Sequence, residues 1–285
     1  MNILVTGSTG FIGKNLVNYL LKKNHNLCLV SKNKKFKFIK KKKINIISLQ
    51  CDINFNKKNL KKVINFSPDI LVHLAWSGIP DYSKKNSKKN LLKQKKFFKK
   101  IFRVTSIKKI IITGSCSEYK NQAYLTSKHF SDSKNKIKNF VKKKCQIKKI
   151  SFIWARLFFV YGKYQNKRSL IPKIIYTLKK RKEINIINRS AKHDYINVLD
   201  IVHFINLNLN LKYTNYECDL GSSFSYRVSD IYSFIKKNFL KLNTCKLKKI
   251  NNAFVAKRIN HAISGWKPKI DIEIGLKQLL NSNAV

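Results

Sequence analysis

A glycine-rich turn at the N-terminus constrains the fold of this chain more than any other segment. Gly7, Gly10 and Gly13 follow a short apolar run, Asn2–Val5, and open an amphipathic stretch, Phe11–Lys22. At this spacing the first glycine permits a tight turn, the second lets the backbone approach a pyrophosphate, and the third lets the helix pack closely on the strand. The free N–H groups and the macrodipole of the helix N-terminus favour anions there. The segment therefore predicts a dinucleotide site at Gly7, Thr9, Gly10, Phe11, Ile12 and Gly13.

Short apolar runs alternate with longer amphipathic stretches through the first half of the chain. Strands are expected at Asn2–Val5, Leu27–Val30, Ile44–Leu49, Ile70–Leu74, Ile110–Thr113 and Lys149–Trp154. Helices are expected at Phe11–Lys22, Lys57–Asn65, Lys84–Phe102 and Lys128–Lys144. This alternation predicts an α/β fold with a doubly wound parallel sheet of the Rossmann type.

The regular alternation is lost after about Ala155, which predicts a smaller, interleaved C-terminal lobe. We expect residues 1–165 to form the dinucleotide-binding domain, with later elements near residues 190–210 returning to it. Residues 166–285 are then expected to form mainly a substrate-binding lobe.

The chain is strongly basic. Its 285 residues include 61 Lys and Arg but 13 Asp and Glu, a formal net charge of +48. The Lys residues are spread along the whole chain, which favours a compositional bias at exposed positions over a dedicated polyanion site.

The six Cys residues have no CxxC spacing and no His cluster beside them, which indicates reduced thiols and no metal site. No segment has the composition of a secretory signal or a membrane span, so we expect a cytoplasmic protein with no membrane partner.

The end of the second expected strand bears on the choice of cofactor. NAD sites usually place Asp or Glu there to bind the ribose hydroxyls. Ser31 and Lys32 stand at this position, and a cation without a carboxylate favours NADP(H), with NAD(H) as the alternative. Asp52, which precedes Ile53 just after the third expected strand, is either an acceptor for the adenine amino group or a turn residue.

Further motifs occur along the chain in a recognisable order. They are His73–Trp76, Ser115–Tyr119, Tyr124–Lys128, Arg156–Gly162, Asp194–Val198 and Gly265–Pro268. On these residues and the glycine turn, the chain resembles the NAD-dependent epimerase/dehydratase family, the extended short-chain dehydrogenases, from Met1 to about Leu280. The stretch from His73 to Gly162 is most similar to members that reduce 4-keto-6-deoxy nucleotide sugars in surface polysaccharide synthesis.

The resemblance implies a catalytic trio of Ser115, Tyr124 and Lys128. Tyr124 precedes Lys128 by the spacing of one helix face, and a neighbouring ammonium favours the phenolate form of a tyrosine. Tyr124 and Lys128 are also expected to contact the cofactor, and Ser115 to hydrogen-bond the reacting oxygen. The resemblance further implies a cofactor floor at Leu74, Ala75 and Trp76, a structural His73, and substrate contacts at Ser117, Phe159, Ser169 and Leu170. It implies a homodimer formed through the expected helices Lys84–Phe102 and Lys128–Lys144.

Positions at which this chain differs from the family's motifs reduce the number of reactions expected of it. Cys116 and Ser117 stand where 4,6-dehydratases of the family carry an Asp-Glu pair, so dehydration is not expected. Ser117 and Ser169 stand where relatives that epimerise C3 and C5 carry Cys and His. Two reactions remain open, 4-ketoreduction with NAD(P)H and 4-epimerisation with bound NAD, and Ser31 favours the reductase. His193 replaces an Arg of the family that binds diphosphate, a role left to Arg227 or a Lys. A third alternative, from another class, is an inactive relative that binds nucleic acid.

The net charge predicts nonspecific binding of nucleic acid at low ionic strength. We expect the affinity to be lost at moderate salt, because counterion release drives such binding. Fluorescence anisotropy of a labelled oligonucleotide against salt concentration would measure it. No binding at low salt would contradict this prediction, and affinity that persists at physiological salt would favour the nucleic-acid-binding alternative.

Overall fold

A computed structural model describes residues 1–32, 45–119, 127–182, 184–243, 246–250, 254–257 and 265–282. The chain divides into two compact units. The first comprises Met1–Arg156 and Asn208–Cys218, and the second comprises Leu157–Leu207 and Asp219–Val285.

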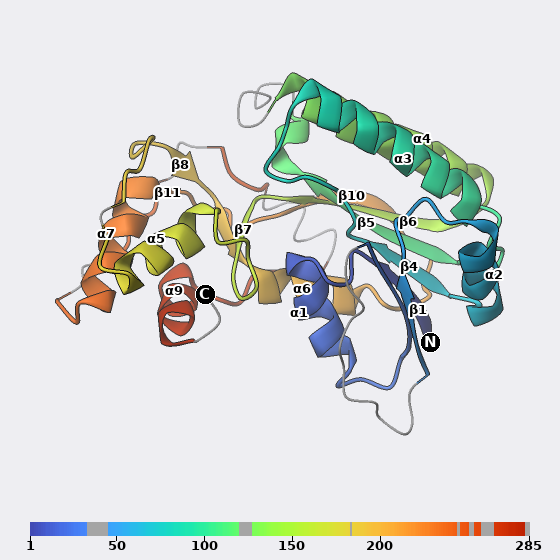
Figure 1. Ribbon diagram of the computed structural model, residues 1–285, viewed down its shortest axis with the longest axis horizontal. Helices are drawn as coiled ribbons and strands as arrows, with labels where there is room; N and C mark the ends of the chain where they lie inside the picture. The colour runs from blue at the N-terminus through green and yellow to red at the C-terminus, as the bar shows by residue number, and fades with distance from the viewer. Residues whose placement is uncertain are drawn as a thin grey trace. The chain divides into compact units, whose positions relative to one another are not determined.

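The first unit is built on a seven-stranded sheet in the order β10-β6-β5-β4-β1-β2-β3 (Figure 1). Its strands are β1 (Asn2–Thr6), β2 (Asn26–Ser31), β3 (Ile46–Gln50), β4 (Ile70–His73), β5 (Lys109–Ser115), β6 (Ser151–Leu157) and β10 (Asn215–Leu220). Strands β3, β2, β1, β4 and β5 pair in parallel, and the strand order reverses between β1 and β4. Such a reversal is where doubly wound sheets bind their ligands. The predicted α/β fold is confirmed.

Helices cover both faces of this sheet. They are α1 (Phe11–Leu20), α2 (Lys57–Phe66), α3 (Lys84–Ile101) and α4 (Lys128–Ile147). Helices α3 and α4 contact each other on one face, and α1 lies on the other (Figure 1). No helix among the described residues is both long and apolar enough to cross a bilayer.

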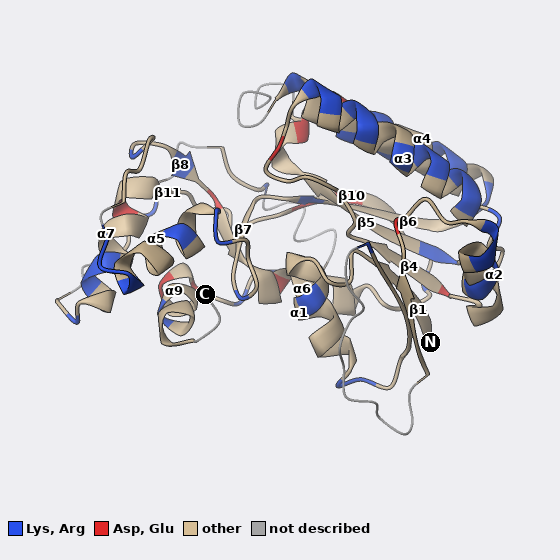
Figure 2. Ribbon diagram, viewed as in Figure 1, with Lys and Arg blue, Asp and Glu red and all other residues tan. Residues whose placement is uncertain are grey.

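The sequence of α3 shows why it packs as it does. Its buried residues recur at three- and four-residue spacing, the period of one helix face, and are Ser87, Asn90, Gln94, Phe97, Phe98 and Ile101. The intervening Lys residues face outward, which makes this helix and α4 strongly basic (Figure 2). Phe97 and Phe98 pack with buried side chains of the sheet, including Leu4, Leu71 and Ile110, to form the core of the unit.

The expected strands and helices of the first unit are present, with differences at their ends. Lys149 was expected to begin a strand, but its φ of 52° places it in the left-handed region just after α4, and β6 starts at Ser151. Such a residue commonly ends a helix. Strand β5 extends past the expected Thr113 to Ser115, because backbone pairing does not require an apolar side chain at the strand end. Ile44 lies outside the described residues, and the strand expected from there is β3.

The second unit has its own core. It contains α5 (Leu170–Lys179), α6 (Val198–Leu207), α7 (Val228–Phe239) and α9 (Ile272–Asn281), with strand pairs β7 (Phe159–Tyr161) with β9 (Tyr195–Asn197) and β8 (Lys192–His193) with β11 (Tyr226–Arg227). Apolar side chains of α5, α7 and α9 form one cluster with Tyr195 and Tyr226. The Asp194 carboxylate is fully buried and accepts hydrogen bonds from Ser222, Ser223 and Ala256, so it ties the segment before β9 to two later segments.

Candidate functional site

The glycine turn joins β1 to α1 in the predicted order. Gly7 has a φ of 72°, and its carbonyl accepts the Gly10 N–H at 2.9 Å. Gly10 is the N-cap of α1 and carries no side chain, so it supplies no capping oxygen to the first amide groups of the helix. Thr9, Phe11 and Ile12 are part-exposed beside them.

The turn fits a dinucleotide, because it leaves no room for side chains at the close approach. A Cβ added to Gly13 would lie 2.1 Å from the Gly7 carbonyl oxygen, and one added to Gly7 would lie 3.0 Å from the Ala75 nitrogen. The backbone of β1, α1 and the segment after β4 therefore meets at one place, which is the form of a pyrophosphate cradle. The expected cofactor residues Gly7, Gly13 and Ala75 are brought together here.

Residues at the ends of β2 and β3 lie where a bound adenosine would be expected. Ser31 is buried at the end of β2 and pairs in register with Gln50 of β3, while Lys32 is exposed. Asp52 is bound by Lys93 of α3 at 2.6 Å. Partial burial alone would raise the pKa of Asp52, but the hydrogen bond and charge of Lys93 outweigh it and lower this pKa. The neighbouring Ile53 packs in the core.

The end of β4 and the segment that follows it are held by buried contacts. His73 is buried, its ring nitrogens lie 2.8 Å from Thr6 Oγ1 and 2.7 Å from Gln94 Oε1, and its ring stacks on Phe97. Burial lowers the pKa of His73 to about 3, so the ring is neutral at physiological pH. These contacts agree with the structural role expected for His73. Leu74 continues this segment, and its N–H donates to the Thr6 carbonyl.

Trp76 is held between two residues of α4. Its ring meets Phe130 edge to face at 5.6 Å, and the buried Lys134 ammonium lies 4.1 Å from its centroid. Lys134 Nζ also donates to the Thr113 carbonyl of β5. The floor after β4 is thereby joined to α4 and to β5.

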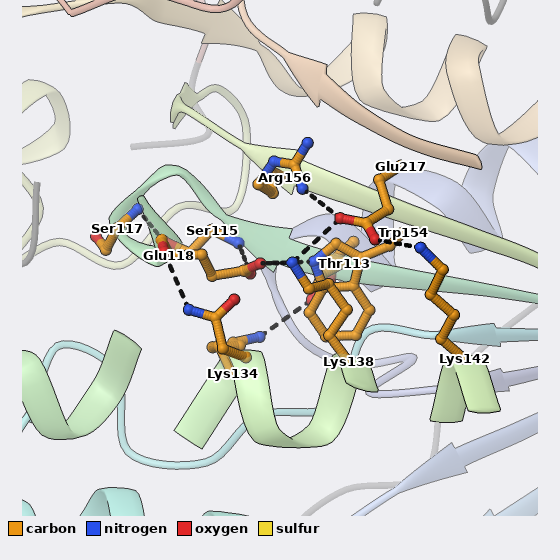
Figure 3. A network of polar contacts seen from close by, with 11 residues as sticks. Thr113, Ser115, Ser117, Glu118, Lys134, Lys138, Lys142, Trp154, Arg156 and Glu217 are labelled. Atoms are coloured by element: carbon orange, nitrogen blue, oxygen red, sulfur yellow. Dashed lines mark hydrogen bonds and ion pairs between the residues drawn. The ribbon is translucent and has the colours of Figure 1, made fainter. Parts of the chain in front are cut away.

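Ser115 ends β5 and starts the 3₁₀ turn η1 (Cys116–Glu118). Its Oγ accepts the Ser117 N–H at 3.2 Å, and its own N–H donates to Glu118 Oε1 at 2.7 Å. Ser117 and Cys116 are buried. Figure 3 shows that Glu118 also faces Trp154 and Lys138, and that Lys138 leads on to Glu217 and Arg156. Ser115 is thus the outer end of an extended polar network.

Helix α4 begins at Lys128, which is exposed, and Ser127 caps it by accepting the Phe130 N–H. Tyr124 lies outside the described residues. Its expected spacing on one helix face with Lys128 stays a prediction, because the described part of α4 starts at Lys128.

The expected substrate residues Phe159, Ser169 and Leu170 lie in the second unit. Phe159 stacks on His193 with ring centroids 3.8 Å apart. Ser169 is the N-cap of α5, and Leu170 begins that helix and packs on the core of the unit. Burial lowers the pKa of His193 to about 4, so the ring is uncharged at neutral pH. Arg227 pairs with Lys192 in the β8–β11 ladder, one position from His193.

Comparison with known proteins settles the family. The model of the NAD dependent epimerase/dehydratase family matches residues 3–216. The chain belongs to this family. CDP-abequose synthase from Salmonella muenchen is 24% identical over 98% of this chain and 97% of its own length.

Solved enzyme structures show the same fold. The UDP-glucose 4-epimerase of Thermotoga maritima, solved with UDP-glucose, superposes with a TM-score of 0.80 at 17% identity, over 98% of this chain and 97% of that one. The enzyme WbmF of Bordetella bronchiseptica, solved with NADH, gives a TM-score of 0.80 at 18% identity, over 98% and 90%. These structures show that the chain shares its fold with enzymes of this kind.

Sequence reasoning missed the charged residues behind Ser115 in this epimerase/dehydratase family member. Glu118 lies inside the Ser115–Tyr119 motif but was given no role there. Lys134 and Lys138 lie outside the motifs, among many other Lys residues. A signal was present in Glu118 itself, because an acid is rare in a chain with 13 Asp and Glu and this one directly follows the expected catalytic segment.

His73 predicts a pH dependence of stability. Because its folded pKa of about 3 lies below the ordinary value of 6.5, protonation favours the unfolded chain. This residue should therefore lower the free energy of unfolding by about 1.4 kcal/mol per unit as the pH falls below the ordinary value. Urea unfolding of the wild type and of His73→Gln at several pH values below 6.5 would measure how the free energy of unfolding changes with pH in each protein. Parallel pH profiles for the two proteins would contradict the prediction.

Proposed function

We propose that this family member reduces the 4-keto group of a 4-keto-6-deoxy nucleotide sugar, with NADPH as the preferred donor, in the synthesis of a surface polysaccharide. The observation that carries the proposal is the composition of the turn after β5. Cys116 and Ser117 provide no carboxyl group, and the carboxylate oxygens of Glu118 are engaged by Ser115 and Trp154. The turn can therefore orient an oxygen but is poorly equipped to remove a proton from carbon, which dehydration requires.

The chemistry follows from Ser115 and the expected Tyr124–Lys128 pair. A reduced nicotinamide dinucleotide, held by its pyrophosphate at the glycine turn, would supply hydride to C4 and would itself be oxidised. The Ser115 hydroxyl accepts a fixed N–H from Ser117, so its own hydrogen can point to the carbonyl oxygen of a substrate. As this hydride adds to C4, the Tyr124 phenol would give its proton to the C4 oxygen. The product is an alcohol, and the Lys128 ammonium stabilises the phenolate left behind.

Similarity along the whole chain to CDP-abequose synthase supports a nucleotide-linked sugar as the substrate. The uncharged His193 cannot replace the charge of an Arg toward a diphosphate. Arg227, adjacent to it in the β8–β11 pair, is the residue we propose for that contact. Phe159, Ser169 and Leu170 are proposed to contact the rest of the substrate.

Oxidation of NADPH on addition of CDP-, dTDP- or GDP-linked 4-keto-6-deoxy sugars would test the reaction. Tyr124→Phe should lower kcat by about 100-fold or more, because it removes the proton donor. Tyr213→Phe makes the same chemical change at a side chain that is 59% exposed and should leave kcat unchanged. Full activity in Tyr124→Phe would reject the assigned role. Interconversion of C4 epimers without net loss of NADPH would instead establish the epimerase alternative.

The cofactor preference is tested at the end of β2. Ser31→Asp should lower the ratio of kcat/KM for NADPH over NADH by about 10-fold or more, because a carboxylate repels the 2′-phosphate and binds a free ribose hydroxyl. Asn65→Asp, an equal change of charge at an exposed position on α2, is the control. A wild type that prefers NADH, or an unchanged ratio in Ser31→Asp, would contradict the preference.

A further inference from the structure

A buried carboxylate stands directly behind the proposed catalytic serine. Glu118 is 6% exposed, and Trp154, which is fully buried, donates its Nε1–H to Oε2 at 2.8 Å. The other oxygen accepts the Ser115 N–H. Both carboxylate oxygens therefore have hydrogen-bond donors, one at Ser115 and one on β6.

The fit around Glu118 leaves little freedom to the end of β5. A Cβ added to Gly114 would lie 2.5 Å from Glu118 Oε1 and 2.3 Å from Trp154 Nε1. The Glu118 carbonyl accepts the Asn135 side-chain N–H from α4 at 3.0 Å. Carboxylate, indole and backbone thus define the direction in which Ser115 projects from the strand.

Burial of this charge is compensated by Lys residues of α4. Burial raises the pKa of Glu118, while the charges of Lys134 and Lys138 and the donors of Ser115 and Trp154 oppose that rise. Lys138 lies 3.9 Å from Glu118 and 3.1 Å from Glu217, and Glu217 is itself bound by Arg156 at 2.8 Å (Figure 3). A buried charge with hydrogen bonds and partners of this kind holds its neighbours in one geometry.

We infer that Glu118 is a positioning residue for turnover, which holds the Ser115 hydroxyl in its reactive orientation through the Ser115 backbone and Trp154. This inference rests on the proposed function, because the kcat measurements below use the proposed reduction of a keto sugar. Glu118 does not touch the substrate, and its effect passes through Ser115.

Glu118→Gln tests this inference with little change of shape. The amide must turn its NH₂ group toward one of the two donors, so one hydrogen bond is lost. We expect kcat to fall by about 10- to 100-fold, because a small displacement of a catalytic group has effects of that size. The KM for the nucleotide sugar and the fluorescence titration with NADPH should be unchanged. A wild-type kcat in a folded Glu118→Gln protein would overturn the inference.

Glu217→Gln is the matched control. It makes the same change in the same network, at a residue bound by Lys138, Lys142 and Arg156 and without a hydrogen bond to Ser115 in the described contacts. Its kcat should stay within about 3-fold of the wild type. Equal losses in the two variants would show that the network acts through general stability and would overturn the specific role of Glu118.

A double-mutant cycle with Ser115→Ala separates positioning from a structural effect. If Glu118 acts through the Ser115 hydroxyl, then adding Glu118→Gln to Ser115→Ala should lower kcat by no more than about 2-fold. Independent, multiplied losses would contradict the inference. If Glu118→Gln does not fold, Trp154→Phe can be used instead, because it removes the other donor to the Glu118 carboxylate. Trp154→Phe should lower kcat by about 3-fold or more in the wild type, but should not lower it further in Ser115→Ala.

Hydrogen exchange at the Ser115 amide gives a readout that does not need turnover. The amide should be protected in the wild type and in Glu217→Gln. It should exchange about 10-fold faster or more in Glu118→Ala, which removes the acceptor of the Ser115 N–H. Equal exchange rates would overturn the inference. A wild type that reduces no keto sugar but shows this difference in exchange would refute the proposed function and leave the contact between Glu118 and Ser115 established.

Discussion

The close approach of Gly13 to the Gly7 carbonyl is the constraint on which the rest of the site depends. No side chain fits between them, so the N-terminus of α1 lies against the end of β1 and the backbone after β4. The contact sits beside the reversal of strand order between β1 and β4. Amide groups of α1 and the floor at Ala75 therefore face one place, and a dinucleotide phosphate can be bound by backbone alone.

Acidic residues are scarce in this chain, and several of them connect segments that are distant in the sequence. With 61 Lys and Arg against 13 Asp and Glu, most cations have no acidic partner available. Glu118 and Glu217 join β5, β6, α4 and β10, Asp52 joins the end of β3 to α3, and Asp194 joins three segments of the second unit. Each of these acids therefore connects segments that are distant in the sequence.

Much of the first unit could be predicted because its signals are local. The apolar runs and the glycine turn occupy adjacent residues, and the expected strands and helices formed with shifts at their ends. Lys149 was placed in a strand because its left-handed conformation depends on how α4 ends, which apolar patterning does not report. The two interpretations of Asp52 could not be separated from sequence, since its partner Lys93 is 41 residues away.

The sequence by itself determined the α/β class, the dinucleotide turn and the family, because each depends on residue types at short, regular spacing. Tertiary structure alone decided what stands behind Ser115. Glu118 meets Trp154, 36 residues away, since β5 and β6 are neighbours in the sheet. It meets Lys138 because α4 packs there, and Glu217 joins because β10 adds to the same edge. Contacts of this kind depend on the order of strands in space, which no local pattern of residues specifies.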